Sequence, residues 1–527
     1  MKRDLEAIRS KLRGYNPWWY DRDWDKKDQN LSDFRNSVLK VEPRLYYHII
    51  RNITGPHYGI ITIRGPRRVG KTTLLKLVVD HLIRERKVDP LSIFYVSLDY
   101  QGLKDVDLAE IIEVIAHSSN GEKYIFLDEV SMYRDWALVL KNVYDMGLIE
   151  RAKLKIIATG SHSMDLAEAV SKLRDRQGDL ARKFNLGGNL IFRTLRFSEV
   201  IEALDPEINR ELQSSEFRKV KKRFQVLQYL SQGIIDEALR NIYDSYYSLL
   251  VTSFEDYLVH GGYPKAIDLY YKYGTIDESI YKDIAKLLIG DSERADLNPN
   301  TLSNILFYLT DENSLSGPLD LSDLASKLGV SRKDVRDRGF SLGQYLEYLK
   351  SASAFFFAYQ EGDECVSNFE PSIRPKNYVL DPFLYFSLYS YLRNIPNPFG
   401  KSKEMLENES FKGLLVESTV ASHLLNAQFL FEHISDVRFE NVLMYTRAEG
   451  SETDFVLCVN RSTERYRFLI ECKYRKRPEV NKESLKDAST FIVLTRDKLY
   501  KEELRDEKGS TTRHVIYVPV PVFLLLF

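Results

Sequence analysis

A glycine-rich segment near the start of the chain sets its fold class. The segment fits the pattern G-x-x-x-x-G-K-[ST] without a mismatch. The run before it, 58–63, is short and rich in β-branched residues, which predicts a buried strand. The run after it, 73–79, has the apolar spacing of a helix packed on a sheet. The pattern therefore predicts a P-loop whose nucleotide-binding residues are Gly65, Pro66, Arg67, Arg68, Val69, Gly70, Lys71, Thr72 and Thr73.

Each part of this loop has an expected chemical task. Backbone N–H groups and the helix N-terminus converge on anionic oxygens, so they are expected to hold the phosphates of a nucleoside triphosphate. Lys71 is expected to reach the β- and γ-phosphates, and the hydroxyl of Thr72 to bind Mg²⁺.

A second apolar stretch, 124–127, ends in two carboxylates, as a Walker B strand does. Asp128 is expected to hold the Mg²⁺, and Glu129 to act on the attacking water as a general base. Carboxylates at this place are otherwise helix caps. A further strand, 154–158, leads to Thr159, whose hydroxyl is expected either to sense the γ-phosphate or to lie in a simple turn.

Composition is that of a soluble intracellular protein, and we expect a cytoplasmic location. The chain has 527 residues, enough for three or four domains, and a net charge of −1, so nucleic-acid contact must come from a local basic patch. The three cysteines lack the paired spacing of a zinc site or a disulfide framework, which favours a reducing compartment. No signal peptide or membrane span is expected, and the apolar run 515–527 is interpreted as a terminal core strand.

We expect an α/β protein of five parts. A lead-in, 1–51, carries Trp18, Trp19 and Trp24, which favours packing onto the core. The nucleotide-binding core is 52–200, with a parallel sheet of strands at 58–63, 92–98, 124–127 and 154–158. A charged helical lid, 201–300, a winged-helix domain, 301–395, and a second α/β domain, 400–527, follow. The basic cluster 218–223 of the lid is interpreted as a solvated helix face.

The winged helix is predicted from a short amphipathic helix, a turn at Gly329 and a second helix capped by Ser331. Val335, Leu342, Leu346 and Leu349 are expected on its buried side. A packing role without nucleic acid is the alternative. The residues expected to contact DNA are Arg332, Lys333, Arg336 and Arg338.

The last part carries a second chemical signal. Asp454 lies in one predicted strand, and Glu471 and Lys473 share one face of the next, so a hairpin would place them side by side. Two carboxylates and a lysine are what metal-dependent phosphodiester cleavage requires, and Glu417 is a candidate for a further metal ligand. Ordinary ion pairs on an exposed strand are the alternative.

An ordered series of motifs makes the chain, from Asn16 to its end, resemble the archaeal AAA-type ATPases that carry a winged helix and a PD-(D/E)xK nuclease-like tail. Such proteins are similar to the signal-transducing ATPases with numerous domains. The series consists of the loop 65–73 together with Asn16-Pro17-Trp18-Trp19, Leu127-Asp128-Glu129, 159–166, 257–264, 376–382, Val416-Glu417, 453–456 and Glu471-Cys472-Lys473.

The resemblance implies a restriction-endonuclease-like fold for the tail, with Asp454, Glu471 and Lys473 as the nuclease triad. It implies ATP as the nucleotide, with Mg²⁺, and Mg²⁺ or Mn²⁺ at the tail. Arg176 falls where the family has an arginine facing the phosphates, within the chain or across a subunit interface, although the family's preceding Pro-Gly is replaced here by Arg174-Asp175.

Three functions follow as hypotheses. The leading one is an ATPase coupled to a DNA-acting and DNA-cutting domain. The second is a nucleotide-dependent switch or scaffold for protein partners with a silent tail, and the third is a DNA-remodelling motor, for which a homo-oligomer is expected.

Overall fold

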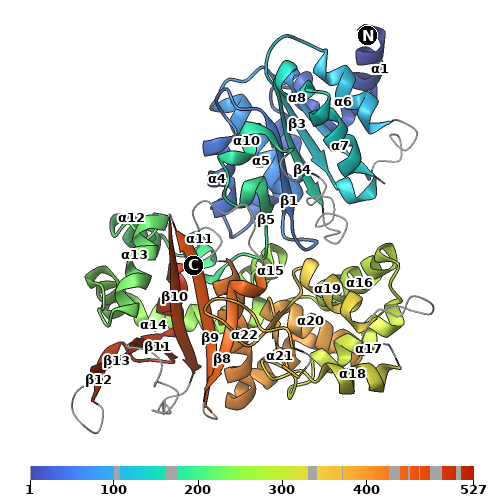
Figure 1. The fold of residues 1–527 in the computed structure, drawn as a ribbon. Coiled ribbons are helices and arrows are strands. Elements are labelled where there is room, and N and C mark those ends of the chain that lie inside the picture. The colour runs from blue at the N-terminus through green and yellow to red at the C-terminus, as the bar shows by residue number, and fades with distance from the viewer. Residues whose placement is uncertain are drawn as a thin grey trace. The chain divides into compact units, whose positions relative to one another are not determined.

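The structure is a computed structural model, shown in Figure 1. It describes residues 2–99, 107–133, 135–160, 173, 176–329, 341–370, 372–426, 439–448, 451–461, 463–474, 490–505 and 512–527. The chain divides into two compact units, one ending at Arg193 and the other running from Thr194 to Phe527. The five-part division expected from the sequence stays a prediction.

The first unit is built on a five-stranded sheet in which every pairing is parallel. The strand order is β2-β3-β4-β1-β5. The strands are β1 (Gly59–Arg64), β2 (Ile93–Ser97), β3 (Lys123–Asp128), β4 (Leu154–Gly160) and β5 (Asn189–Ile191). The P-loop NTPase fold is thereby confirmed, and four strands lie where the sequence predicts them. β5 was missed because three residues are too short to show a pattern.

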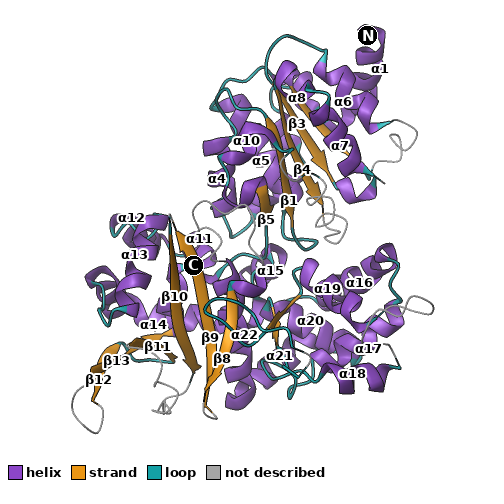
Figure 2. Ribbon diagram, in the orientation of Figure 1, coloured by secondary structure: helices purple, strands orange, loops and turns teal. Residues whose placement is uncertain are grey.

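Helices cover both faces of this sheet (Figures 1 and 2). The buried core on one face includes side chains of α6 and α7, among them Ile112 and Leu140. The helices of the first unit are α1 (Lys2–Leu12), α2 (Trp24–Lys27), α3 (Gln29–Asn36), α4 (Arg44–Asn52), α5 (Lys71–Arg84), α6 (Leu108–Ala116), α7 (Trp136–Asp145), α8 (Leu148–Arg151) and α10 (Gly178–Arg182). Because β1, β3 and β4 pair in parallel, their carboxyl ends lie at one edge of the sheet, and the P-loop follows β1 at that edge.

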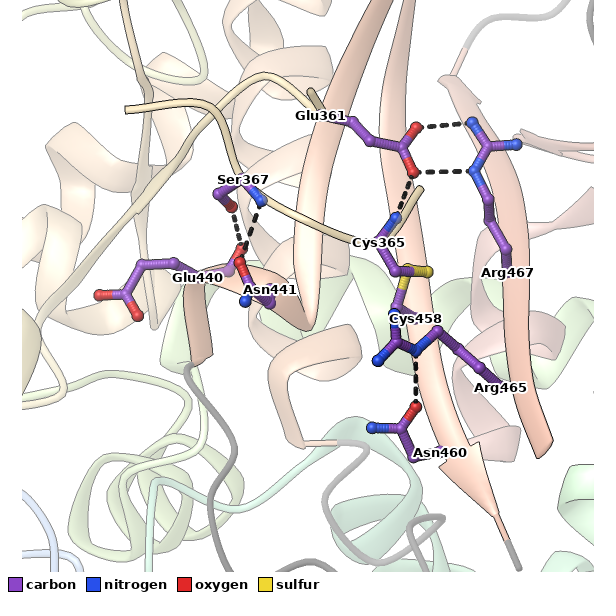
Figure 3. Close-up of a disulfide and its surroundings, with 9 residues drawn as sticks. All are labelled: Glu361, Cys365, Ser367, Glu440, Asn441, Cys458, Asn460, Arg465 and Arg467. Carbon is purple, nitrogen blue, oxygen red and sulfur yellow. Dashed lines mark hydrogen bonds and ion pairs between the residues drawn. A yellow bond between two sulfur atoms is a disulfide. The ribbon is translucent and has the colours of Figure 1, made fainter. Parts of the chain in front are cut away.

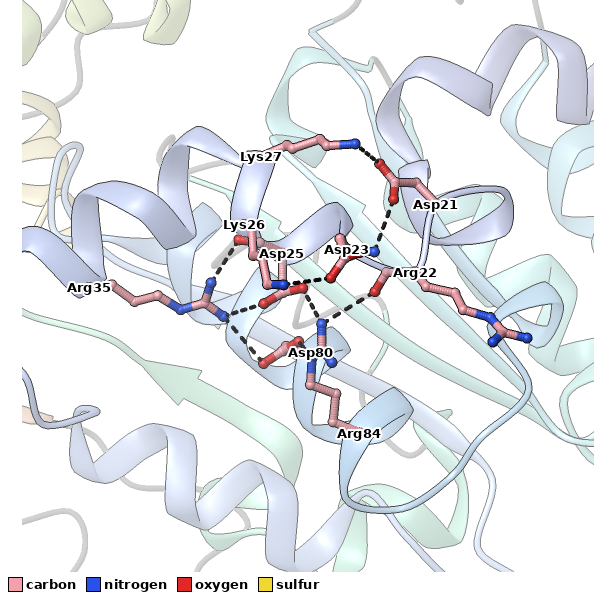
Figure 4. A network of polar contacts seen from close by, with 9 residues as sticks. All are labelled: Asp21, Arg22, Asp23, Asp25, Lys26, Lys27, Arg35, Asp80 and Arg84. Atoms are coloured by element: carbon pink, nitrogen blue, oxygen red, sulfur yellow. Dashed lines mark hydrogen bonds and ion pairs between the residues drawn. The ribbon is translucent and has the colours of Figure 1, made fainter.

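The N-terminal lead-in packs against this core. Figure 4 shows Asp25, from α2, paired with Arg35 of α3 and with Arg84 of α5. Asp25 is buried, so both arginines meet an anion with little access to water. The lead-in is thus attached to the helix that follows the P-loop.

The second unit contains a six-stranded mixed sheet and many helices. The sheet has the order β12-β13-β11-β10-β9-β8, with parallel pairing only at β10-β11 and β11-β13. Its strands are β8 (Leu443–Ala448), β9 (Ser451–Arg461), β10 (Glu464–Lys473), β11 (Thr490–Thr495), β12 (Tyr500–Arg505) and β13 (Thr512–Pro519). A separate antiparallel pair is formed by β6 (Phe355–Ala358) and β7 (Lys376–Val379).

The helices of this unit precede its large sheet, apart from a short one near the end. They are α11 (Phe197–Leu204), α12 (Pro206–Ser214), α13 (Val220–Ser231), α14 (Glu237–His260), α15 (Pro264–Tyr273), α16 (Glu278–Asp291), α17 (Pro299–Leu309), α18 (Leu321–Leu328), α19 (Leu342–Ser351), α20 (Pro382–Leu392), α21 (Pro398–Glu407), α22 (Glu409–Leu425) and α23 (Val520–Phe523). The apolar run 515–527 is a strand only as far as Pro519 and then turns helical, although it is buried as expected.

Two expectations about side chains need correction. Cys365 and Cys458 form a disulfide, shown in Figure 3, which the cysteine spacing had argued against. The two are 93 residues apart, and only the fold brings them together. In the basic cluster 218–223, Arg223 is buried and donates to the carbonyl of Phe527, so this part of the cluster is not a solvated face. The cysteine argument for a reducing compartment therefore fails, and the cytoplasmic location stays a prediction.

Candidate functional site: a nucleotide site and a carboxylate–lysine cluster

The P-loop has the backbone that its glycines predict. A Cβ atom on Gly65 would lie 1.9 Å from the carbonyl oxygen of Phe192, so only glycine fits beneath the neighbouring chain. Gly70 has a φ of +98°, in the left-handed region, and α5 begins at the next residue. The side chain of Lys71 is buried, and its ammonium donates to the carbonyls of Gly65 and Pro66 at 2.9 and 2.8 Å. The lysine therefore lies over the loop that is expected to hold phosphates.

Asp128, at the end of β3, accepts hydrogen bonds from three hydroxyl groups. Its Oδ2 accepts from Thr72 at 2.7 Å and from Tyr95 at 2.6 Å, and its Oδ1 accepts from Thr159. The structure thus brings together the P-loop hydroxyl, the Walker B carboxylate and the hydroxyl that ends β4. One hydroxyl and one carboxylate oxygen, 2.7 Å apart, are oxygen ligands of the kind that Mg²⁺ accepts. The donor set therefore fits the expected metal.

Glu129 follows at the point where the chain leaves the strand. Its φ of +52° is unusual for a residue with a side chain, and its N–H donates to Asp128 Oδ1 at 3.1 Å. Left-handed residues of this kind cluster at functional sites. Arg176, by contrast, pairs with Asp145 at the end of α7 at 2.9 Å, and its role toward the phosphates stays a prediction.

Sequence reasoning missed Tyr95, the one tyrosine that donates to Asp128 among the described residues. Burial raises the pKa of Tyr95 well above its ordinary value, and the charge of Asp128 adds to the rise. The hydroxyl consequently keeps its proton and remains a donor. No local signal marks it, because Tyr95 is one of two aromatic residues in an apolar strand.

The lead-in holds the backbone of that same tyrosine. Asn16 donates to the carbonyl of Tyr95 at 2.8 Å and accepts from its N–H at 2.7 Å. Trp18 and Trp19 donate their ring N–H groups to the carbonyl of Ile93 at 3.2 and 2.9 Å. β2 is an edge strand, so these side chains satisfy backbone groups that no further strand would pair.

The second unit brings the predicted tail residues together. Phe455 of β9 pairs with Ile470 of β10. Asp454 and Glu471 are the next residues along these two strands, so they lie opposite each other. The N–H of Asp454 donates to Glu471 Oε2 at 3.1 Å, and Lys473 lies 2.5 Å from Glu471 Oε1 and 3.9 Å from Asp454 Oδ2. The predicted hairpin geometry is present, while the metal-binding and catalytic roles stay predictions.

Glu417 joins this group from α22, and a second lysine lies among the carboxylates. The ammonium of Lys376 is 3.2 Å from Glu417, 3.1 Å from Asp454 and 2.9 Å from Glu452. Burial raises the pKa of Glu417 to about 7 against the opposing charge of Lys376. Burial and the charge of Asp454 likewise raise the pKa of Glu471 to about 7. The sequence had marked Lys376 only as part of a motif, without a role.

The helix predicted to contact DNA falls largely outside the described residues. Arg332, Lys333, Arg336 and Arg338, with the predicted cap Ser331 and the predicted buried residue Val335, all belong to the segment 330–340, which the structure does not describe. α19 begins after Ser341, which forms a capping box with Gln344, and Leu342, Leu346 and Leu349 are buried as expected. Among the described residues, α17, α18 and α19 precede the β6-β7 pair, and the winged helix stays a prediction.

Comparisons with known proteins agree with the geometry of the first unit. Residues 57–199 match the family described as an AAA domain. The matched residues include the P-loop, all five strands of the first sheet and Glu129. A second match, residues 251–396, is to a domain of unknown function (DUF8612).

The chain is also similar to an uncharacterized protein, MJ1637, of Methanocaldococcus jannaschii. The two are 29% identical over an alignment of 277 residues, which covers 49% of this chain and 51% of the relative. The chain therefore spans about half the length of the curated relative that it matches.

Two solved structures have similar chains. The Walker-type ATPase of Pyrococcus abyssi has a TM-score of 0.35 at 14% identity, covering 67% of this chain and 99% of that one. The Aeropyrum pernix ORC1 protein in complex with DNA has a TM-score of 0.30 at 13% identity, covering 68% and 94%. Both scores are below 0.5, so the fold assignment depends on the sheet order and the P-loop. Within the described residues, no helix combines the length and apolar character that a membrane crossing needs.

Proposed function

We propose that this protein binds ATP with Mg²⁺ and hydrolyses it, and that its nucleotide state governs a second unit that acts on DNA. The observation that carries the proposal is the meeting of Thr72, Asp128 and Thr159 beside the P-loop. These groups come from three segments of chain, and their convergence is what nucleotide hydrolysis requires of an AAA-type site.

The chain's own residues supply the chemistry of hydrolysis in this proposal. Lys71 exchanges the carbonyls of Gly65 and Pro66 for phosphate oxygens and neutralises part of their charge. Asp128 and Thr72 hold Mg²⁺, which supplies further charge stabilisation when bound. Glu129 orients the attacking water and accepts its proton. Thr159, through its hydrogen bond to Asp128, links the end of β4 to the same site.

Steady-state ATP hydrolysis tests this function. We expect Lys71→Ala and Thr72→Ala to lower kcat/KM by roughly 100-fold or more, since each removes a group that contacts the phosphates or the metal. Lys27→Ala is the matched control, because that lysine is exposed and forms its ion pair with Asp21 in the lead-in. Equal activity in wild type and Lys71→Ala would contradict the proposal.

DNA as a ligand is supported by the order of α17, α18 and α19 before the β6-β7 pair, which is typical of a winged helix. We expect binding of duplex DNA that weakens steeply as salt rises, as phosphate contacts do. Binding that is absent at low salt would favour the alternative, a nucleotide-dependent switch for protein partners. A ring-shaped oligomer formed with ATP would favour a remodelling motor.

A metal-dependent nuclease is the second candidate function, favoured by the same triad. The carboxylates are of the right chemical type for Mg²⁺ or Mn²⁺. However, two of the oxygens that a cation would take, on Glu417 and Asp454, are already hydrogen-bonded to Lys376. A divalent cation at these two oxygens would have to displace the ammonium of Lys376, so the observed arrangement does not favour a cleavage step.

A further inference from the structure

Lys376 is surrounded by carboxylates on three sides. It is the first residue of β7, and its side chain is only 5% exposed. Its ammonium has three N–H donors, and Glu452, Asp454 and Glu417 lie at 2.9, 3.1 and 3.2 Å. Each donor therefore has an anionic partner, and the positive charge is compensated where water has little access.

The spacing of the carboxylates does not suit a magnesium ion that is held by three of them at once. Mg²⁺ binds oxygens at about 2.1 Å, so any two of its ligand atoms lie within about 4.2 Å of each other. Among the described residues, no three of these carboxylates place ligand oxygens within 4.8 Å of one another. The group that meets that distance is Glu361 with Cys365 and Cys458, whose sulfur atoms are joined in the disulfide.

Three further oxygens of the cluster, on Asp454 and Glu471, are also engaged. Asp454 Oδ2 accepts from the N–H of Cys472 at 2.9 Å, and Glu471 Oε2 accepts from the N–H of Asp454 at 3.1 Å. Glu471 Oε1 faces Lys473 at 2.5 Å. Lys473 and two backbone N–H groups thus contact oxygens of Asp454 and Glu471 that Lys376 does not contact.

The strand that carries Lys376 is fixed on both sides of it. The next residue, Asn377, pairs through its backbone with Ser316 and Gly317, and its side chain donates to the carbonyls of Leu309 and Ser314. Tyr378 then donates to Glu417 at 3.0 Å. The backbone from which the Lys376 side chain extends is therefore held in place beside the cluster.

We propose that Lys376 is the resident cation of this cluster, in the place that a divalent metal would take in a nuclease. The cluster then joins β7, α22 and β9 through a lysine-centred ion network, and the second unit is a module that does not cut nucleic acid. This inference goes beyond the proposed ATPase function and does not depend on it.

Manganese binding to the nucleotide-free full chain tests the inference directly. Binding is followed by electron paramagnetic resonance. We expect wild type and Asp454→Asn to bind the same amount of Mn²⁺, because the cluster itself holds none. Mn²⁺ bound by wild type and lost in Asp454→Asn would overturn the proposal, whatever the ATPase activity is.

Substitution of the lysine gives a second, independent measurement. Lys376→Met leaves three buried or half-buried carboxylates without their countercharge, so we expect a lower Tm than wild type. We further expect millimolar Mn²⁺ to raise the Tm of this variant by roughly 2–4 °C while leaving that of wild type unchanged. A Lys376→Met protein as stable as wild type without Mn²⁺ would contradict the inference.

Two control variants test whether the response to Mn²⁺ depends on removing the positive charge of Lys376. Lys412→Met removes another buried lysine of the same unit, which pairs with Glu255 at 3.2 Å outside the cluster. We expect Mn²⁺ to leave the Tm of Lys412→Met unchanged. Lys376→Arg keeps the positive charge and is expected to fold without responding to Mn²⁺, so it preserves the test if Lys376→Met does not fold. A Mn²⁺ response of Lys376→Arg equal to that of Lys376→Met would count against the proposal.

Discussion

At the scale of single residues, the nucleotide site depends on how Asp128 is held. Hydroxyl groups of Thr72, Tyr95 and Thr159 donate to its two oxygens, so the carboxylate cannot turn without losing a hydrogen bond. Partners of this kind fix the orientation of metal ligands and are costly to remove. Tyr95 is therefore a positioning residue for the proposed metal site.

The first prediction concerns that tyrosine. Tyr95→Phe keeps the ring and removes one donor to Asp128, so we expect a higher Mg²⁺ concentration for half-maximal ATP hydrolysis and a kcat lower by roughly 10-fold. Tyr124→Phe is the matched control, since that hydroxyl bonds to Glu122 at 3.0 Å at the other end of its strand. Unchanged Mg²⁺ dependence in Tyr95→Phe would show that the contact has no role in metal binding.

The second prediction concerns His260, which is fully buried among tyrosines in the second unit. Burial lowers its pKa from 6.5 to about 4. The unfolded chain then binds more protons than the folded one between pH 4 and 6.5, so the free energy of unfolding falls as the pH drops through this range.

This single residue is expected to contribute on the order of 2–3 kcal/mol to that fall. We therefore expect His260→Gln to show a shallower loss of stability between pH 6.5 and 4 than wild type, measured by urea unfolding. His117→Gln, at a position that is exposed, serves as the control and should leave the slope unchanged. A slope in His260→Gln equal to that of wild type would contradict the assignment.

At the scale of elements, the lead-in closes the open edge of the first sheet. Asn16 pairs with both backbone groups of Tyr95, in the manner of a neighbouring strand. We expect Asn16→Ala to lower the free energy of unfolding by about 1–3 kcal/mol, because two buried backbone groups lose their partners. Asn36→Ala, at an exposed site on α3, is the control for tryptophan-detected unfolding. A midpoint equal to that of wild type would show that the edge is satisfied in another way.

The disulfide connects the segment before β7 to β9. In Figure 3 it lies beside the ion pair between Glu361 and Arg467, which joins the same segment to β10. The cross-link spans 93 residues, so its loss is expected to lower the free energy of unfolding by roughly 2–4 kcal/mol. We expect one alkylated cysteine when the protein is unfolded without reductant, and three after reduction. Three without reductant would rule the disulfide out.

At the scale of the whole molecule, the features that the sequence predicts correctly are those formed by neighbouring residues. Contacts between residues far apart in the sequence were mostly not predicted. The P-loop and four parallel strands, one of which is the Walker B strand, are encoded in runs of neighbouring residues, and the structure has them where expected. Tyr95, Lys376 and the Cys365–Cys458 pair meet their partners only through the fold, so no local spacing marks them. Asp454 and Glu471 were found because a hairpin is itself a local structure.

ATP binding and turnover in one sample test the central claim most directly. We would mix wild type and Glu129→Gln with labelled ATP and Mg²⁺, and measure bound nucleotide and released phosphate in a single turnover. We predict equal ATP binding by both proteins and phosphate release slower by about 100-fold or more in Glu129→Gln, because only the general base is lost. Turnover at the wild-type rate in Glu129→Gln, or no ATP bound by wild type, would contradict the proposed ATPase.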